Sequence, residues 1–174
     1  MGRVWEIAQL GHPVLRKIAE PVEKIDDGVQ QLIDDLFATS EAASGAGIAA
    51  PQVYVSSRVF ILSIKPSVRY PDAPEVEPTA VINPEILWQS ENLEKDWEGC
   101  LSVPGIRGRV PRPDAIGVRY QTRHGETVER EFSGFAARVF LHEHDHLEGM
   151  TWLDHVEDNR EIVSEQEFMR ALID

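Results

Sequence analysis

The sequence predicts an α+β fold in which short strands pack around a central helix that carries a His-Glu-x-x-His motif. At 174 residues the chain is long enough for one domain with a sizeable core, so we expect a single domain spanning residues 1–174. Helical apolar spacing is clearest in two separate segments, and the strand-like runs lie between them. Helices segregated from antiparallel or mixed short strands are typical of the α+β class.

The first predicted helix follows Asp26 and Asp27, whose carboxylates can cap its positive end. Its apolar residues recur at steps of 3, 1, 3 and 1, which places them on one helical face. This face comprises Val29, Leu32, Ile33, Leu36 and Phe37. We expect the helix to end near Ser44–Gly45, because glycine is the usual residue at a left-handed helix terminus.

Four strands are expected between the two helices. A run of β-branched and aromatic residues at 58–64 predicts the first strand, and the four prolines of 65–78 predict an exposed loop after it. Residues 79–88 predict a second strand, broken at Asn83–Pro84. The alternating pattern over 115–132 predicts a β-hairpin.

The second predicted helix covers residues 134–147, with Ser133 as a possible cap and Gly149 just past its end. One face of this helix carries Phe135, Val139, His142 and His146. We expect the acidic tail, about residues 156–174, to be helical from Glu161, where Ile162, Phe168 and Leu172 offer some apolar contacts.

The composition limits the possible partners and compartments. A net charge of −13 argues against a nucleic-acid-binding surface. No run approaches the roughly 20 apolar residues needed to span a membrane. Residues 1–6 resemble neither a signal peptide nor a transit peptide, so a cytoplasmic location is expected. Cys100 is the only cysteine, which leaves no intrachain disulfide.

A His-Glu-x-x-His motif lies on the second predicted helix. His142 and His146 are four residues apart, so their imidazoles share one helical face and can bind the same metal ion. Glu143 follows the first histidine and is placed to act as a general base on a metal-bound water. A solvated helix that happens to carry histidines is the alternative, but it does not explain the glutamate at this position.

A catalytic site of this kind needs a third protein ligand and an open position for water. Trp152 occupies the place of the third histidine in one extended form of the motif, which rules that form out. His155 and Asp154 are alternatives further along the chain. Cys100 is the better candidate, because it lies in a Gly-flanked segment, 98–105, where the backbone can bend to present a thiolate.

Three separated motifs carry a family resemblance. They are Gly-Ala-Gly-Ile-Ala-Ala-Pro-Gln at 45–52, Glu-Gly-Cys-Leu-Ser at 98–102 and His-Glu-His-Asp-His-Leu-Glu-Gly at 142–149. In this order they closely resemble the peptide deformylases, and the resemblance extends from about residue 5 to residue 155. One departure is Leu141, where the family usually has Gln. Since Leu141 is not a ligand, we expect a change in local hydrogen bonding and not a loss of activity.

The resemblance implies a hydrolase that removes the formyl group from the N-terminal formyl-methionine of newly synthesised polypeptides and releases formate. By this resemblance Cys100, His142 and His146 bind the metal. A metal-bound water then attacks the formyl carbon, and Glu143 acts first as general base and then as general acid.

The resemblance also assigns groups that contact the substrate. The side-chain amide of Gln52 and the backbone N–H of Leu101 would stabilise the oxyanion. Segment 45–48 would pair with the substrate backbone as an added strand, and apolar side chains including Leu101 would wall a methionine pocket unless they belong to the core. The substrate-binding candidates are Gly45, Gly47, Ile48 and Val139.

Asp145 has a predicted structural role. It points away from the two metal-binding histidines on the helix, so it is not a ligand. In the peptide deformylases, which this sequence resembles, the matching Asp pairs with an Arg downstream of the Cys motif, and Arg112 fits that position. We therefore predict an ion pair, within about 4 Å, that braces the metal-binding helix.

One divalent metal ion per chain is expected. A Cys/His/His set suits several metals, and the resemblance implies Fe(II), with Zn(II), Ni(II) or Co(II) as possible substitutes. The implied partners are N-formyl-methionyl nascent polypeptides, with the ribosome as a further candidate, although the acidic tail is unsuited to direct RNA binding. Two rival interpretations are a zinc peptidase with a downstream third ligand and a non-catalytic domain with a closed, four-ligand metal site.

Overall fold

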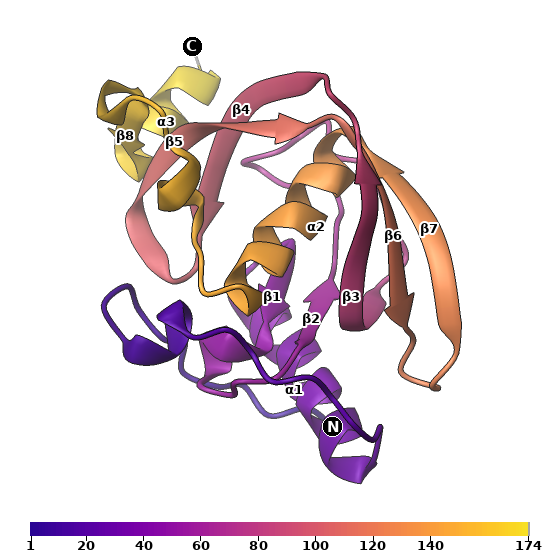
Figure 1. Ribbon diagram of the computed structural model, residues 1–174. Coiled ribbons are helices and arrows are strands. Elements are labelled where there is room, and N and C mark those ends of the chain that lie inside the picture. The colour runs from indigo at the N-terminus through magenta and orange to yellow at the C-terminus, as the bar shows by residue number, and fades with distance from the viewer. Residues whose placement is uncertain (174) are drawn as a thin grey trace.

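The computed structural model describes residues 1–173 of the chain (Figure 1). The α-helices are α1 (Asp27–Ala42), α2 (Gly134–Leu147) and α3 (Glu165–Ile173). The strands are β1 (Gly47–Ala49), β2 (Val59–Leu62), β3 (Thr79–Gln89), β4 (Leu93–Cys100), β5 (Val103–Pro113), β6 (Ala115–Gln121), β7 (Thr127–Ser133) and β8 (Ile162–Ser164). Short 3₁₀ helices are η1 (Pro13–Arg16), η2 (Ala50–Val53), η3 (Trp152–His155) and η4 (Asn159–Glu161).

Five strands form an antiparallel sheet in the order β1-β2-β3-β6-β7. Its register pairs Ile48 of β1 with Ile61 of β2, and Phe60 of β2 with Val81 of β3. Because β1 is an edge strand, its side away from β2 has no strand partner within residues 1–173. That free edge can accept hydrogen bonds from another extended chain.

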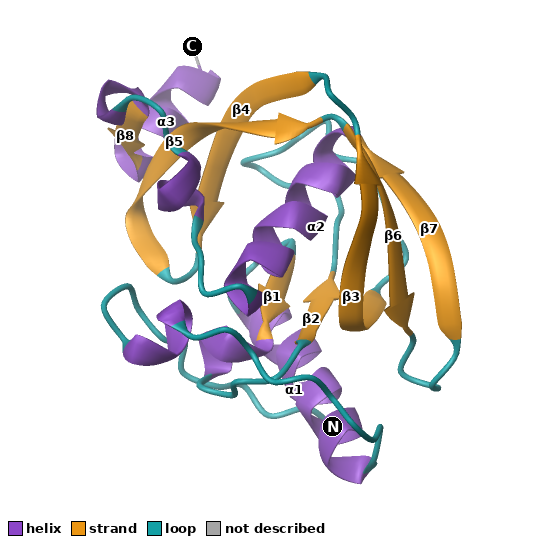
Figure 2. Cartoon of the chain, in the orientation of Figure 1, coloured by secondary structure: helices purple, strands orange, loops and turns teal. Residues whose placement is uncertain are grey.

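A smaller antiparallel sheet has the order β4-β5-β8. Cys100 ends β4 and pairs with Val103 across the turn into β5. The short β8 covers only Ile106–Gly108 of β5. Figures 1 and 2 show α2 lying between this sheet and the larger one, so α2 can present a different face to each.

The limits of α2 follow from local chemistry. Ser133 holds the N-cap position, although its side chain makes no capping hydrogen bond. Gly149 lies just past the helix with φ 72°, a left-handed conformation that favours glycine. A Cβ on Gly149 would lie 2.7 Å from the carbonyl oxygen of Arg16, so the chain beyond α2 fits only if this residue is glycine.

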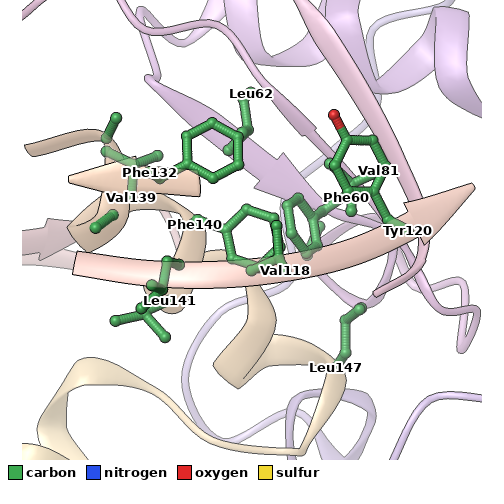
Figure 3. Close-up of a cluster of buried hydrophobic side chains, with 14 of the residues drawn as sticks. Phe60, Leu62, Val81, Val118, Tyr120, Phe132, Val139, Phe140, Leu141 and Leu147 are labelled. Carbon is green, nitrogen blue, oxygen red and sulfur yellow. The ribbon is translucent and has the colours of Figure 1, made fainter. Parts of the chain in front are cut away.

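The main apolar core lies between α2 and the five-stranded sheet (Figure 3). The ring of Phe140 on α2 lies 5.0 Å from the ring of Phe60 and 5.3 Å from that of Phe132. Val118 and Leu62 are fully buried in the same cluster. Aromatic side chains contribute most to such cores because each removes a large apolar area from water.

A second core lies between α1 and the strands β1 and β2. Ile33 and Leu36 of α1 are fully buried there, together with Ile48 and Ile61. Asp35 on α1 also ties down the N-terminal segment, because its carboxylate accepts bonds at 2.7 Å from the backbone N–H of residue 3 and at 2.9 Å from Trp5 Nε1.

The α+β prediction is confirmed, and the expected helices 27–44 and 134–147 are present as α1 and α2. The predicted break at Asn83–Pro84 is wrong. Strand β3 continues through this point as a bulge, with Asn83 at φ 49° and its side chain bonded to the backbone of Val22. Such bulges are tolerated where polar groups find other partners.

The tail differs from the sequence prediction in where its helix begins. Helix α3 starts at Glu165 and not at Glu161, because the residues between them pair with β5 as β8. Phe168 of α3 is buried against Trp97 of β4, with ring centroids 5.6 Å apart. Within residues 1–173, no helix has the length and apolar character required to cross a membrane.

Candidate metal centre and active site

Cys100, His142 and His146, the predicted metal ligands, lie together at the end of β4 and on α2. Their ligand atoms are all within 4.8 Å of one another. Cys100 Sγ lies 3.4 Å from Nε2 of His146, although the two residues are 46 positions apart in the chain. The turn between β4 and β5 brings the thiol to the face of α2 that carries both imidazoles.

The chemistry of this donor set fits a divalent transition metal. A thiolate and two imidazoles bind iron, zinc, nickel and cobalt, and three protein ligands leave room for water or substrate. Burial raises the pKa of the Cys100 thiol, but the neighbouring His146 and His142 outweigh burial and hold that pKa well below its usual value. The thiolate, which is the form that binds metals, is therefore favoured.

Glu98 orients the first histidine. Its Oε1 lies 2.8 Å from Nδ1 of His142, which leaves the other ring nitrogen for a metal. The same carboxylate accepts bonds from Arg112 at 2.8 and 2.9 Å and from Arg138 at 2.9 Å. Burial alone would raise the pKa of Glu98, but the charge and hydrogen bonds of Arg112, assisted by His142, lower it well below its usual value. Glu98 is thus a fixed, ionised acceptor for His142.

Arg112 also contacts Asp145. Its Nη1 lies 2.6 Å from Asp145 Oδ2, which is within the distance expected from the sequence. His155 Nε2 lies 2.9 Å from the same carboxylate oxygen, and Asp154 Oδ2 lies 2.6 Å from Nη1 of Arg16. The two downstream candidates for a third metal ligand, His155 and Asp154, therefore pair with other side chains and lie outside the Cys100 cluster.

Glu143 is a buried carboxyl beside the three ligands. Its Oε2 has no hydrogen-bond partner within residues 1–173. A Cβ on Gly47 of β1 would lie 2.9 Å from Glu143 Oε1, so a larger residue there would displace the carboxyl. Burial raises the pKa of Glu143 to about 7, despite the opposing effect of His142 and His146. A group with a pKa near neutrality is suited to proton transfer.

Gln52 and Leu101 place N–H groups near the thiol. Gln52 Oε1 accepts a bond from Ala49 N at 2.9 Å, which points the amide nitrogen away from β1. That nitrogen donates to Ser102 Oγ at 3.1 Å and lies 3.6 Å from Cys100 Sγ. The N–H of Leu101, in the turn between β4 and β5, has no acceptor among the loop and turn hydrogen bonds of residues 1–173.

A cleft of about 1170 Å³ opens over this cluster. The predicted site residues that line it are Gly45, Gly47, Gln52, Cys100, Leu101, Val139, His142 and Glu143. The side chain of Ile48 is absent from this lining, because it is fully buried against α1 and β2. The structure therefore places the Ile48 side chain in the core and not, as expected, in the wall of a substrate pocket.

The sequence analysis assigned no role to two residues that have a clear role at this site. Glu98 precedes Cys100 by two positions within its motif, and a carboxylate there was a usable signal for a partner of a metal-binding histidine. Arg138 lies one helical turn before His142 and also donates to the carbonyl oxygens of Val110 and Glu94 at 2.8 and 2.7 Å. No sequence pattern predicted those carbonyl contacts, because they depend on how α2 meets β4 and β5.

Comparison with known proteins gives the family. The model of the polypeptide deformylase family matches residues 4–161. The chain belongs to the polypeptide deformylase family. A peptide deformylase 2 from Nostoc sp. is 53% identical over 167 residues, covering 95% of this chain and 93% of the relative.

Solved structures of polypeptide deformylases share the fold. The class I type b peptide deformylase from Acinetobacter baumannii, bound to Met-Ala-Ser, is 44% identical with a TM-score of 0.87, covering 90% of this chain and all of the other. A peptide deformylase from Synechococcus elongatus in complex with actinonin is 33% identical with a TM-score of 0.79, covering 97% of this chain and 84% of the other. Because the deformylase family match ends at residue 161, β8 and α3 lie beyond it.

Proposed function

We propose that this chain is a metal-dependent hydrolase that removes the N-formyl group from formyl-methionine at the start of newly synthesised polypeptides. The observation that carries this proposal is the cluster of Cys100, His142 and His146 at a cleft that Cys100, His142 and Glu143 line, in a member of the polypeptide deformylase family. The products are formate and a peptide with a free amino terminus.

Cys100, His142 and His146 would hold the metal, with Glu98 fixing the orientation of His142. When bound, a divalent metal supplies Lewis acidity, which lowers the pKa of water and polarises a carbonyl oxygen. A closed structural site would require a fourth protein ligand. The described residues offer three in this cluster, which favours a catalytic site over a structural one.

Glu143 moves the proton in this proposal. Its carboxylate accepts a proton from the attacking water and then gives it to the leaving amine. The free Oε2 and the pKa of about 7 both suit a group that must accept and release a proton near neutrality. Gly47 maintains this geometry by leaving space for the carboxyl.

The oxyanion of the tetrahedral intermediate needs donors that are already in place. Gln52 Nε2 and the N–H of Leu101 are the groups assigned to it. The bond from Ala49 N to Gln52 Oε1 supports this role, because it fixes which end of the amide faces the thiol. Losing one such donor raises the barrier by roughly 3–4 kcal/mol.

The free edge of β1 would bind the peptide by main-chain hydrogen bonds, which accept many sequences. Gly45 and Gly47 border this path, and Ile48 would contribute only its backbone. Val139 and Leu101, which line the cleft, would contact the methionine side chain. This arrangement would give specificity for the first residue and tolerance for the following ones.

Four further assignments stay proposals. Fe(II) is the metal that we favour, with Zn(II), Ni(II) or Co(II) as substitutes, since all four suit a Cys/His/His set. One catalytic domain would include the tail 156–174. The enzyme would act in the cytoplasm on nascent chains, and it would contact the ribosome in that role.

The decisive assay is formate release from formyl-Met-Ala-Ser by protein loaded anaerobically with Fe(II), Ni(II), Co(II) or Zn(II). We expect stoichiometric formate and Met-Ala-Ser, with Fe(II) activity declining in air. Acetyl-Met-Ala-Ser is the control for a general acyl hydrolase, and release of Ala-Ser would indicate a peptidase. Absence of formate with Fe(II), Ni(II) and Co(II) would reject the proposed function.

A further inference from the structure

Glu165, the first residue of α3, joins two arginines from distant parts of the chain. Its Oε1 lies 2.7 Å from Nε of Arg69, in the loop between β2 and β3, and its Oε2 lies 2.5 Å from Nε of Arg107 on β5. Arg107 Nη1 also donates to the hydroxyl of Tyr70 at 2.7 Å. We refer to Glu165, Arg69, Arg107 and Tyr70 as the Glu165 cluster.

Glu165 is the carboxylate on which this cluster depends. Within residues 1–173, neither Arg69 nor Arg107 has another carboxylate oxygen within 4.0 Å of its nitrogen atoms. Without Glu165 the two guanidinium groups would repel each other, and the position of Arg69 would no longer be fixed by an ion pair. Glu165 is only partly exposed, and it retains its charge because Arg69 and Arg107 lower its pKa against the effect of burial.

The Glu165 cluster belongs to the wall of the catalytic cleft, since all four of its residues line that cleft. The Arg107 guanidinium packs against Gly99, where an added Cβ would lie 2.7 Å from Arg107 Cζ. Gly99 directly precedes the predicted ligand Cys100. The ring of Tyr70 in turn lies 4.7 Å from that of Phe135, another cleft residue, so the cluster fixes both charged and apolar parts of the wall.

We propose that Glu165 is a positioning residue for peptide binding, which fixes Arg107 and the Arg69–Tyr70 segment where they face the peptide beyond its formyl-methionine. The inference rests on the proposed function. It gives the C-terminal segment, which lies beyond the family match, a part in substrate recognition. Glu165 lies in the wall and is not among the residues assigned to proton transfer or metal binding, so its loss should weaken peptide binding and leave the chemical step intact.

The test compares Glu165→Gln with Glu167→Gln. Both variants remove one negative charge from α3, but Glu167 is 60% exposed and, among the described residues, its carboxylate forms an ion pair only with Arg170 of its own helix. For Glu165→Gln we expect KM for formyl-Met-Ala-Ser to rise about three- to tenfold, with kcat within about twofold of the parent. For Glu167→Gln we expect both constants to be unchanged. Glu165→Asp, which keeps the charge but is too short to reach both arginines, should fall between the parent and Glu165→Gln.

Calorimetric titration with Met-Ala-Ser gives a second measurement that does not depend on turnover. We expect its Kd to rise by the same factor as KM in Glu165→Gln. If Glu165→Gln does not fold, as judged by thermal unfolding, Glu165→Asp and Arg69→Gln are measured in its place, with the same direction expected.

The inference is overturned if Glu165→Gln matches Glu167→Gln in both KM and Kd, or if its loss lies in kcat alone. Failure of the proposed function is a different result. In that case the parent protein releases no formate, while the Met-Ala-Ser titration still reports on Glu165.

Discussion

The two sides of α2 differ in how they hold the helix. On the side of the five-stranded sheet, Phe140 packs against Phe60 and Phe132 in an apolar core. On the side of the three-stranded sheet, Glu98 of β4 receives hydrogen bonds from Arg112 and Arg138 and contacts His142. Apolar contacts have little directional preference, whereas hydrogen bonds between charged groups fix orientation.

This difference suggests that one side of α2 mainly contributes to the stability of the fold and the other mainly to metal binding and catalysis. The apolar side sets where α2 lies, and the charged side sets how His142 points. Changes on the apolar side should therefore alter the free energy of unfolding more than the catalytic constants of the folded protein. Changes on the charged side should alter catalysis, metal binding or both.

The largest expected effect is from Glu143→Gln, at the buried carboxyl beside the three proposed metal ligands. Removing the group proposed to transfer the proton should lower kcat by about 10²–10⁴-fold. The free energy of unfolding should not fall, because a neutral amide replaces a buried carboxyl whose pKa is raised by burial. Formate release and chemical denaturation measured on the same preparation test both parts. A variant with parental kcat would remove Glu143 from the mechanism.

Glu98→Ala should affect both properties. It leaves Arg112 and Arg138 buried without their shared carboxylate, which should cost about 3–5 kcal/mol of unfolding free energy. Loss of the acceptor for His142 should also weaken metal affinity by about 10–100-fold. Urea denaturation and metal titration measure the two effects. If metal affinity is unchanged in folded protein, Glu98 does not orient His142.

Leu62→Ala tests the apolar side. This side chain is fully buried in the cluster around Phe60 and Phe140, so its truncation should lower the free energy of unfolding by about 2–5 kcal/mol. We expect kcat per folded molecule to stay near the parental value. A large fall in kcat at temperatures where the variant is fully folded would contradict the separation of the two sides.

The smallest expected effect is from Asp35→Ala, on α1 and away from both sides of α2. Loss of the bonds to residue 3 and Trp5 should cost about 1–2 kcal/mol, with no change in activity. Although burial opposes it, hydrogen bonding lowers the pKa of Asp35 in the folded protein below its ordinary 3.8. Its ionic contribution to stability is therefore present above that value and is lost as the pH falls through the folded pKa. Denaturation at pH 7 and pH 3 should show a smaller difference between parent and variant at pH 3.

Regular apolar spacing, together with capping and terminating residues at helix ends, accounts for what the sequence could predict of the fold. Asp26 caps α1, the alternating run over 115–132 became the hairpin of β6 and β7, and Gly149 follows α2. Strands β4 and β5 were not predicted. Their inward residues include charged ones such as Glu98 and Arg112, which interrupt the usual alternation of apolar and polar residues.

Prolines are a second reason why β5 was not predicted from the sequence. Pro111 and Pro113 argue against a strand with partners on both sides. They are tolerated because β8 pairs with Ile106–Gly108 and, in the part of the chain that the structure describes, this end of β5 pairs with no strand other than β4. In the site, motifs and family resemblance gave the three proposed ligands and Glu143. The partners of Glu98 and Glu165 depend on contacts between distant segments, which local sequence patterns do not encode.

The central claim is that Cys100, and not a residue after the helix, completes the metal site. Metal stoichiometry and formate release should be measured together for the parent, Cys100→Ser and His155→Asn. We expect about one metal ion per chain and formate release in the parent, loss of both in Cys100→Ser, and retention of metal in His155→Asn. Parental metal content and formate release in Cys100→Ser would contradict the account.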